Sequence, residues 1–238
     1  MSKSNPKNSS INKLLLPYDV YERHKAVGDL ILKNETVLDI GGELNHLSQF
    51  CHPAKIVVAN LTGGDVIIQK EKLPFAKNSF DVVSSIDVLE HIPKEDRQEF
   101  VKKLTDIAAK RVILSFPIGT TGHVKYEKEI QSWLQKIGAN VSFLKEHIKY
   151  GLPTIDEISK ISKNQESRIF YSGNLTFNKY LFYLYLFDPQ IKYLGKLIYF
   201  SKLIFNFLTN PIFYAFLSNR KFSESINRAY LIIDKKNR

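Results

Sequence analysis

The apolar positions of this chain fall into short, uninterrupted runs separated by amphipathic stretches. Near the start, apolar residues at helical spacing predict a helix from about Tyr18 to Leu32. The runs that follow predict strands over Thr36–Ile40, Lys55–Asn60, Asp65–Ile68, Phe80–Ile86 and Arg111–Phe116. Continuous apolar strands that alternate with helices are typical of a parallel sheet covered on both faces. The pattern therefore predicts a doubly wound α/β domain.

The polar spacing predicts helices between and after these strands. They are expected to begin near His46–Cys51 and to cover Glu95–Ala109, about Tyr126–Ile137 and Thr154–Ser162, whereas Val141–Tyr150 has a weaker period. Thr154 with Glu157 three residues later forms a capping box at one helix start. Two further apolar runs, within Ser167–Ser172 and Arg228–Asp234, predict two more strands.

The same pattern divides the chain into four parts. Residues 1–13 are polar and are expected to form a flexible tail, and residues 14–172 hold the α/β domain. Residues 173–227 form a helical, aromatic-rich insertion or lid, and residues 228–238 return as the final strand and a tail. The single cysteine and the lack of an apolar core near the N-terminus favour a cytoplasmic protein.

Charge is distributed unevenly over these parts. Of the net charge of +10, residues 168–238 contribute +8, from 11 Lys and Arg against 3 Asp and Glu. The same stretch holds 18 of the 29 aromatic residues. Basic and aromatic residues together indicate either an anionic membrane surface or an anionic polymer as a neighbour. The alternative is a lid whose aromatic side chains pack inward while its lysines are solvated.

Within the insertion, Leu203–Asn219 is a run of 17 residues without charge. About 20 apolar residues are needed to span a bilayer, and this run contains Asn206, Asn210 and Pro211, so a spanning helix is not expected. Interfacial helices fit better, with Lys192, Lys196 and Lys202 available for lipid phosphates at the inner face of a membrane. Such a placement favours a lipid-linked or hydrophobic substrate.

The stretch Thr36–Asn45 is the candidate ligand-binding turn. Its apolar run ends at Gly41 and Gly42, and a strand that ends in glycines brings a ligand close to backbone N–H groups. The most specific local sequence lies around the fourth strand. It comprises Leu73-Pro74-Phe75, Asn78-Ser79-Phe80-Asp81 and Leu89-Glu90-His91-Ile92-Pro93.

These motifs resemble the class I S-adenosylmethionine-dependent methyltransferases, over about Tyr18 to Ser172 with a returning strand at Arg228–Asp234. The resemblance implies a Rossmann-like, seven-stranded, mostly parallel sheet with its last strand antiparallel. It also implies S-adenosylmethionine as the cofactor, lying across the carboxyl ends of strands one to four. The positions that the resemblance assigns to cofactor binding are Asp39, Gly41, Gly42, Glu43, Asn45, Asn60, Leu61, Gln69, Ile86, Asp87 and His91.

Four of these positions depart from the family pattern. Glu43 and Asn45 stand where the family usually has its second and third glycines, and a side chain at position 43 obstructs the ligand unless φ is negative there. Asn60 and Gln69 stand where acids usually bind the ribose hydroxyls and the adenine amino group. Each weakening costs on the order of 1 kcal/mol. The alternative to an enzyme is therefore a non-catalytic binding or scaffold protein on a methyltransferase fold.

Candidate catalytic groups are two histidines that follow the fifth strand, with His123 in the loop directly after it. His123 follows Gly119-Thr-Thr-Gly, and His147 precedes the Tyr150-Gly-Leu-Pro turn. Either could remove a proton from a hydroxyl, although each could equally cap a helix or contact solvent. The six histidines are scattered along the sequence, so no metal site is predicted.

The sequence predicts an S-adenosylmethionine-dependent methyltransferase. We expect O-methylation of a small-molecule, glycan or lipid-linked acceptor, with a possible anionic membrane surface contacted through residues 173–227. Modification of nucleic acid is a third reading, supported by the basic C-terminus but by no RNA-binding motif. The oligomeric state does not follow from the sequence.

Overall fold

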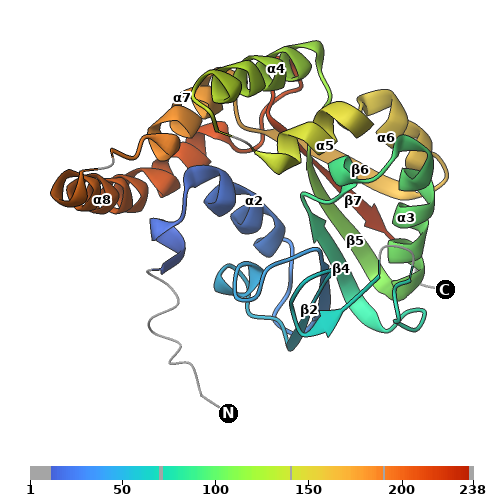
Figure 1. The fold of residues 1–238 in the computed structure, drawn as a ribbon. Coiled ribbons are helices and arrows are strands. Elements are labelled where there is room, and N and C mark those ends of the chain that lie inside the picture. The colour runs from blue at the N-terminus through green and yellow to red at the C-terminus, as the bar shows by residue number, and fades with distance from the viewer. Residues whose placement is uncertain (1–11, 70–71, 140, 190, 236–238) are drawn as a thin grey trace.

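The computed structural model describes residues 12–69, 72–139, 141–189 and 191–235, which form one mixed sheet with helices on both faces (Figure 1). The strands are β1 (Thr36–Ile40), β2 (Lys55–Asn60), β3 (Val66–Ile67), β4 (Phe80–Ile86), β5 (Ala108–Pro117), β6 (Glu166–Ser172) and β7 (Arg228–Asp234). Their order is β3-β2-β1-β4-β5-β7-β6. β7 runs antiparallel to β5 and β6, and the other pairings are parallel. The predicted seven-stranded α/β fold is confirmed.

The helices pack against this sheet because its side chains alternate between two apolar faces. They are α2 (Tyr18–Gly28), α3 (Lys94–Ile107), α4 (Thr121–Lys136), α5 (Ser142–Tyr150), α6 (Ile155–Ile161), α7 (Leu175–Leu186) and α8 (Lys192–Leu217), with short 3-10 turns η1 (Lys13–Leu15), η2 (Leu47–Gln49) and η3 (Leu89–His91). α3 and α6 cover one face, with Leu104 and Ile158 against Leu38 and Val112. α2 covers the other face, where Val27 lies in the core.

Several predicted elements differ from the observed ones. The first helix ends at Gly28 rather than Leu32, and α4 begins at Thr121 rather than near Tyr126. The helix expected from His46 is only the single turn η2, and β3 is shorter than expected. Ala108 and Ala109, expected at the end of a helix, instead begin β5. Alanine is compatible with either state, so the pairing of Ala108 with Phe80 on β4 decides the boundary.

The predicted insertion 173–227 forms α7 and α8, which extend together away from the sheet (Figure 1). Side chains of α8 fix it to the start of the domain. Asn206 Nδ2 donates to the Leu15 carbonyl at 2.9 Å, and Asn210 Nδ2 donates to the carbonyls of Leu14 and Leu16 at 3.0 and 2.9 Å. Both asparagines are buried, so these two polar side chains of α8 face inward.

The outward face of α8 is apolar. Its exposed side chains include Tyr193, Leu197, Phe200, Ile204, Leu208, Ile212 and Phe216. They recur three or four residues apart and therefore form one stripe along the helix. Lys202 was expected to contact lipid phosphates. Its ammonium instead donates to the carbonyls of Tyr185 and Phe187 at the end of α7. Among the described helices, none has both the length and the apolar character to cross a bilayer.

Candidate functional site

The turn after β1 is built from two glycines that no other residue could replace without movement. Gly41 has a φ of +80°, and a Cβ on it would lie 2.3 Å from Cγ2 of Val88. A Cβ on Gly42 would lie 2.0 Å from Oδ2 of Asp39. Such separations are far inside van der Waals contact, so the turn needs glycine at both positions. Val88 and Asp39 therefore pack directly against the backbone of the turn.

Glu43 and Asn45 stand where the family pattern has two glycines, and both residues tolerate the backbone conformations that they adopt. Asn45 has a φ of +67°, a conformation that asparagine tolerates better than most residues. Glu43 does not have a positive φ. Its side chain is 74% exposed, and its Oε2 lies 3.5 Å from Nδ1 of His46. The obstruction anticipated at position 43 is therefore relieved, because the carboxylate points toward solvent.

Asp39 places a carboxylate beneath this turn. The residue is fully buried, and its Oδ1 accepts a hydrogen bond from Ser84 Oγ at 2.8 Å on the paired strand β4. Its Oδ2 has no hydrogen-bond partner within the part of the chain that the structure describes. Burial raises the pKa of Asp39 to about 6, although the bond from Ser84 opposes this shift. An unpartnered acceptor next to Gly42 suits a donor supplied by a ligand, such as an ammonium group.

Asn60 closes the turn from the neighbouring strand. Its Nδ2 donates to the carbonyl oxygens of Gly41 and Gly42 at 3.2 and 2.9 Å, while its Oδ1 accepts from the N–H of Leu61 at 2.6 Å. A carboxylate could not donate these bonds, so the amide at this position is explained by the turn itself. Only the carbonyl oxygen of Asn60 keeps a lone pair for a ribose hydroxyl.

The remaining predicted cofactor residues lie along the same edge of the sheet. Leu61 is 44% exposed after β2, and Gln69 is exposed after β3, where it forms a bridge with Lys72. Ile86 is buried at the end of β4. The structure thus brings the turn, the end of β2 and the end of β4 together, as expected from the parallel sheet.

Asp87, which the family resemblance assigns to cofactor binding, is paired with two arginines. It has a φ of +55°, and its carboxylate accepts a 2.6 Å bond from Arg23 of α2 as well as bonds from Arg228 of β7. Burial disfavours the charge on Asp87, but Arg228 and Arg23 outweigh it and lower the pKa to about 2. Arg228 also lies 3.7 Å from buried Glu22. Sequence reasoning missed both arginines, since their partners are distant in the chain.

Two histidines lie beside this edge with one nitrogen each held by a carboxylate. His147 Nδ1 lies 2.7 Å from Glu127 on α4, and His91 Nδ1 lies 2.6 Å from Glu146 on α5. The two imidazole rings are neighbours, with centroids 4.9 Å apart. A carboxylate partner orients an imidazole and leaves its Nε2 as the available atom.

Glu90 completes a cluster with these histidines. One ligating atom from each of Glu90, His91 and His147 lies within 4.8 Å of the others. Burial, followed by the nearby charge of Asp87, raises the pKa of Glu90 well above its ordinary value. His91 and His147, which are scattered in the sequence, are therefore neighbours in the fold, while the expectation of no metal site stays a prediction. Their 56-position separation in sequence is closed by α5, which packs on η3.

Arg97 fixes the spacing between the two halves of this cluster. It is fully buried on α3, and its Nε donates to the Ile92 carbonyl at 3.0 Å, directly after η3. Its other nitrogens donate to the carbonyls of Tyr150 and Gly151 at the end of α5 and to Glu157 at 3.0 Å. One guanidinium therefore ties the segment carrying His91 to the segment carrying His147.

His123 lies in the first turn of α4 rather than on a loop, with Thr120 Oγ1 accepting from its backbone N–H at 3.0 Å. The side chain is buried, and its Nε2 lies 3.9 Å from Glu127. Burial, with the positive charge of Arg228 nearby, lowers the pKa of His123 to about 3. The imidazole is therefore neutral near pH 7.

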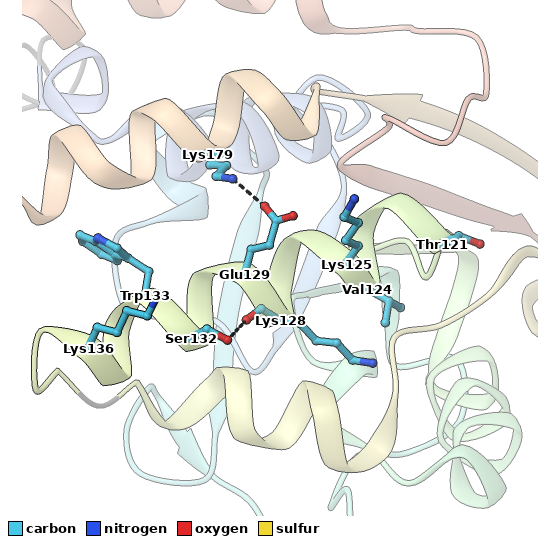
Figure 2. A pocket seen from close by; sticks show the side chains of 9 residues that line it. All are labelled: Thr121, Val124, Lys125, Lys128, Glu129, Ser132, Trp133, Lys136 and Lys179. Atoms are coloured by element: carbon cyan, nitrogen blue, oxygen red, sulfur yellow. Dashed lines mark hydrogen bonds and ion pairs between the residues drawn. The ribbon is translucent and has the colours of Figure 1, made fainter.

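A separate groove of about 660 Å³ lies between α4 and α7, on the outer side of α4. Figure 2 shows Lys179 paired with Glu129 across it, at 2.6 Å, with Trp133 at one end and further lysines along α4. None of the residues predicted from the sequence to bind cofactor lines this groove. It is therefore distinct from the edge of the sheet described above.

Comparison with known proteins agrees with this geometry. Residues 32–116 match the methyltransferase domain family, and comparison with curated proteins finds no match. A Thermotoga maritima S-adenosylmethionine-dependent methyltransferase, described as a possible histamine N-methyltransferase, is similar at 11% identity and a TM-score of 0.54, over 97% of this chain and 95% of that one.

Two further solved structures share the fold. Haemonchus contortus phosphoethanolamine N-methyltransferase 2 is similar at 14% identity and a TM-score of 0.53, over 99% of this chain and 59% of its own. A Mycobacterium tuberculosis cyclopropane synthase is similar at 15% identity and a TM-score of 0.50, over 96% and 94%. Residues 32–116 thus match the methyltransferase domain family, and the seven-stranded fold of the chain is similar to that of S-adenosylmethionine-dependent methyltransferases.

Proposed function

We propose that the chain transfers a methyl group from S-adenosylmethionine to an oxygen of a small-molecule, glycan or lipid-linked acceptor. The observation that carries the proposal is the glycine turn over Asp39, because its unpartnered Oδ2 offers an acceptor to the cofactor's ammonium group. The residues fit the amino-acid end of the cofactor in this way. At the adenosine end, the carbonyl oxygen of Asn60 is available to a ribose hydroxyl.

An oxygen acceptor is supported by the groups next to this turn. Val88 packs against Gly41, and η3 with Glu90 follows immediately, so the acceptor side of the site borders the histidine cluster. A hydroxyl must lose its proton during methyl transfer, and a neutral imidazole held by a carboxylate can receive it. His147 suits this role better than His123, because Glu127 holds its Nδ1 and its Nε2 has no partner among the described residues.

Calorimetric titration with S-adenosylhomocysteine tests the cofactor part of the proposal. The wild-type chain is expected to bind one equivalent, and Asp39→Asn is expected to weaken binding about tenfold by removing the charge beneath the turn. Glu99→Gln, at an exposed position of α3, serves as the control and should bind like the wild type. No heat of binding at millimolar ligand would instead favour the non-catalytic scaffold.

A second proposal concerns the apolar stripe of α8, which we propose contacts an anionic membrane surface. The stripe is continuous and exposed, Lys196 lies on the same helix, and the region has an excess of basic residues. Apolar side chains beside cations are the combination that binds anionic lipid interfaces. This contact would place a lipid-linked acceptor near the domain.

Sedimentation with phosphatidylserine vesicles tests this proposal. The triple variant Phe200→Ser, Ile204→Ser and Leu208→Ser should pellet far less than the wild type. Ile67→Ser is the matched control, because Ile67 is an equally exposed apolar residue on β3 and should leave pelleting unchanged. Equal pelleting of the triple variant and the wild type would contradict the proposal.

A further inference from the structure

The cluster of Glu90, His91 and His147 contains two buried atoms that lack partners. Glu90 Oε2 and His147 Nε2 have no hydrogen bond to any described residue, although Glu90 is 1% exposed and His147 is 7% exposed. An unsatisfied buried polar atom costs about 1–3 kcal/mol. Two such atoms at one place, from η3 and α5, indicate a missing shared partner.

The atoms around them specify what that partner must be. Glu127 and Glu146 occupy the Nδ1 atoms of the two histidines, so each imidazole turns an Nε2 lone pair outward from its carboxylate. An atom that accepts two imidazole lone pairs and one carboxylate oxygen is a cation. Imidazoles held by carboxylates are the usual arrangement at metal centres in proteins.

We propose that Glu90, His91 and His147 bind a divalent first-row transition metal ion, with Glu127 and Glu146 positioning the two imidazoles. Two nitrogen ligands and one oxygen ligand suit zinc, cobalt, iron or manganese, whereas calcium and magnesium favour all-oxygen sites. Three protein ligands leave coordination positions open for a substrate or water.

The geometry allows this binding after a small adjustment. Ligands with bonds of about 2.1 Å stand roughly 3.0–3.5 Å apart, so the ligating atoms, now within 4.8 Å, must close by about 1 Å. The His91 side chain is 29% exposed and its partner Glu146 is 50% exposed, so this half of the cluster is free to move inward. The nearby guanidiniums of Arg23 and Arg228 are both paired with Asp87.

The position of the ion would define the acceptor, an extension that rests on the proposed function. An ion next to the turn of Gly41 would coordinate an acceptor hydroxyl and lower its pKa, so that its proton leaves to solvent. The oxygen then forms a bond to the methyl carbon as the carbon–sulfur bond breaks, which yields a methyl ether and S-adenosylhomocysteine. With the ion bound, His147 would be a ligand and would no longer receive the proton, and the acceptor would carry metal-coordinating oxygens.

Titration of the chelator-treated full chain with Co²⁺ tests the proposal directly. We expect one equivalent of Co²⁺ to bind. Its ligand-field absorption should saturate, and it should disappear when Zn²⁺ displaces the bound Co²⁺. Mg²⁺ at the same concentration should not displace it. The absence of saturable binding up to millimolar Co²⁺ would overturn the proposal.

Variants locate the ion and separate it from the cofactor. Glu90→Gln and His147→Gln should each weaken Co²⁺ binding at least 100-fold, and Glu127→Gln about 10–100-fold. His52→Gln, an exposed histidine outside the cluster, should bind like the wild type. Unchanged affinity in Glu90→Gln and His147→Gln would overturn the assignment. Near-UV circular dichroism confirms folding, and S-adenosylhomocysteine calorimetry reports cofactor binding separately, so the two proposals can fail independently.

Discussion

At the scale of single residues, Gly42 and Asn60 determine the shape of the turn after β1, and each does so through contacts that other residue types could not make. Gly42 leaves room for the Asp39 carboxylate, and Asn60 donates to two carbonyls of the turn. These contacts explain why a glycine and an amide occupy their positions. They also show that Asn60 has a structural role before any ligand arrives.

Gly42→Ala should therefore lower the free energy of unfolding by about 1–3 kcal/mol, because its Cβ would overlap Asp39 Oδ2. It should also weaken S-adenosylhomocysteine binding. Gly63→Ala is the matched control, since a Cβ there meets nothing within 4 Å, and it should change stability by less than about 1 kcal/mol. Urea unfolding measures both, and equal stabilities of the two variants would contradict the argument.

His24 makes a separate contribution that depends on pH. It is buried on α2, with Nδ1 2.8 Å from the Val20 carbonyl and its ring stacked on Phe50. Burial, with Arg23 nearby, lowers the pKa of His24 to about 3. Because the unfolded chain takes up this proton below about pH 6.5 and the folded chain does not, the contribution of His24 to stability is lost as the pH falls.

His24→Phe should remove this dependence. Between pH 7 and pH 5, its free energy of unfolding should fall by about 2 kcal/mol less than that of the wild type. The comparison cancels the other titrating groups, which are common to both proteins. Chemical denaturation at the two pH values measures it, with His52→Gln as the control at an exposed histidine. Parallel pH profiles for His24→Phe and the wild type would show the argument to be wrong.

At the scale of elements, α8 has an unusual distribution of residues, with asparagines inside and aromatic residues outside. Asn206 and Asn210 supply donors to the three carbonyls of residues 14–16, in and directly after η1. Hydrogen bonds therefore join apolar packing in fixing α8 to the start of the domain.

Asn210→Leu should release η1, because the carbonyls of Leu14 and Leu16 would lose their donor at a cost of about 1–3 kcal/mol. Hydrogen exchange should become faster over residues 12–17 while the core strands stay protected. Ser201→Ala, on the exposed face of α8, is the control and should leave exchange unchanged. Uniformly faster exchange across the sheet would mean that the variant destabilises the whole fold instead.

Most elements could be predicted from the sequence, because strands such as β1, β2 and β4 each contain a short run of apolar, mainly β-branched residues. The boundary at Ala108 could not, since a strand pairing decides it. In the site, the glycine turn followed from its local sequence. The pairing of His91 with His147 and the contacts of Arg228 could not be predicted, because they depend on how α5 and β7 pack.

At the scale of the whole molecule, buried ion pairs connect α2 to the sheet. Arg228 of β7 and Arg23 of α2 share the carboxylate of Asp87 after β4, and Glu22 of α2 accepts from the hydroxyl of Tyr230. These buried side chains reach their hydrogen-bonding and ionic partners only when α2, β7 and the end of β4 are all in place. The network therefore makes docking of α2 part of global folding.

Arg228→Met should lower the free energy of unfolding by about 3–5 kcal/mol, because Glu22 and Asp87 would lose a buried partner. Arg168→Met on the adjacent strand β6 is the control, since its side chain is 61% exposed and lies 3.7 Å from Asp234. The control should change stability by less than about 1 kcal/mol. Thermal unfolding compares them, and similar losses would contradict a special role for the buried arginine.

The guanidinium of Arg97 also affects the proposed metal site. It joins the chain just after His91 to the chain just after His147, and its side chain is fully buried. Neither a substrate nor a chelator would reach it. Loss of this side chain would therefore be expected to weaken the proposed metal site while its three ligands remain intact. A comparison of sequences at the three ligand positions alone would miss that loss.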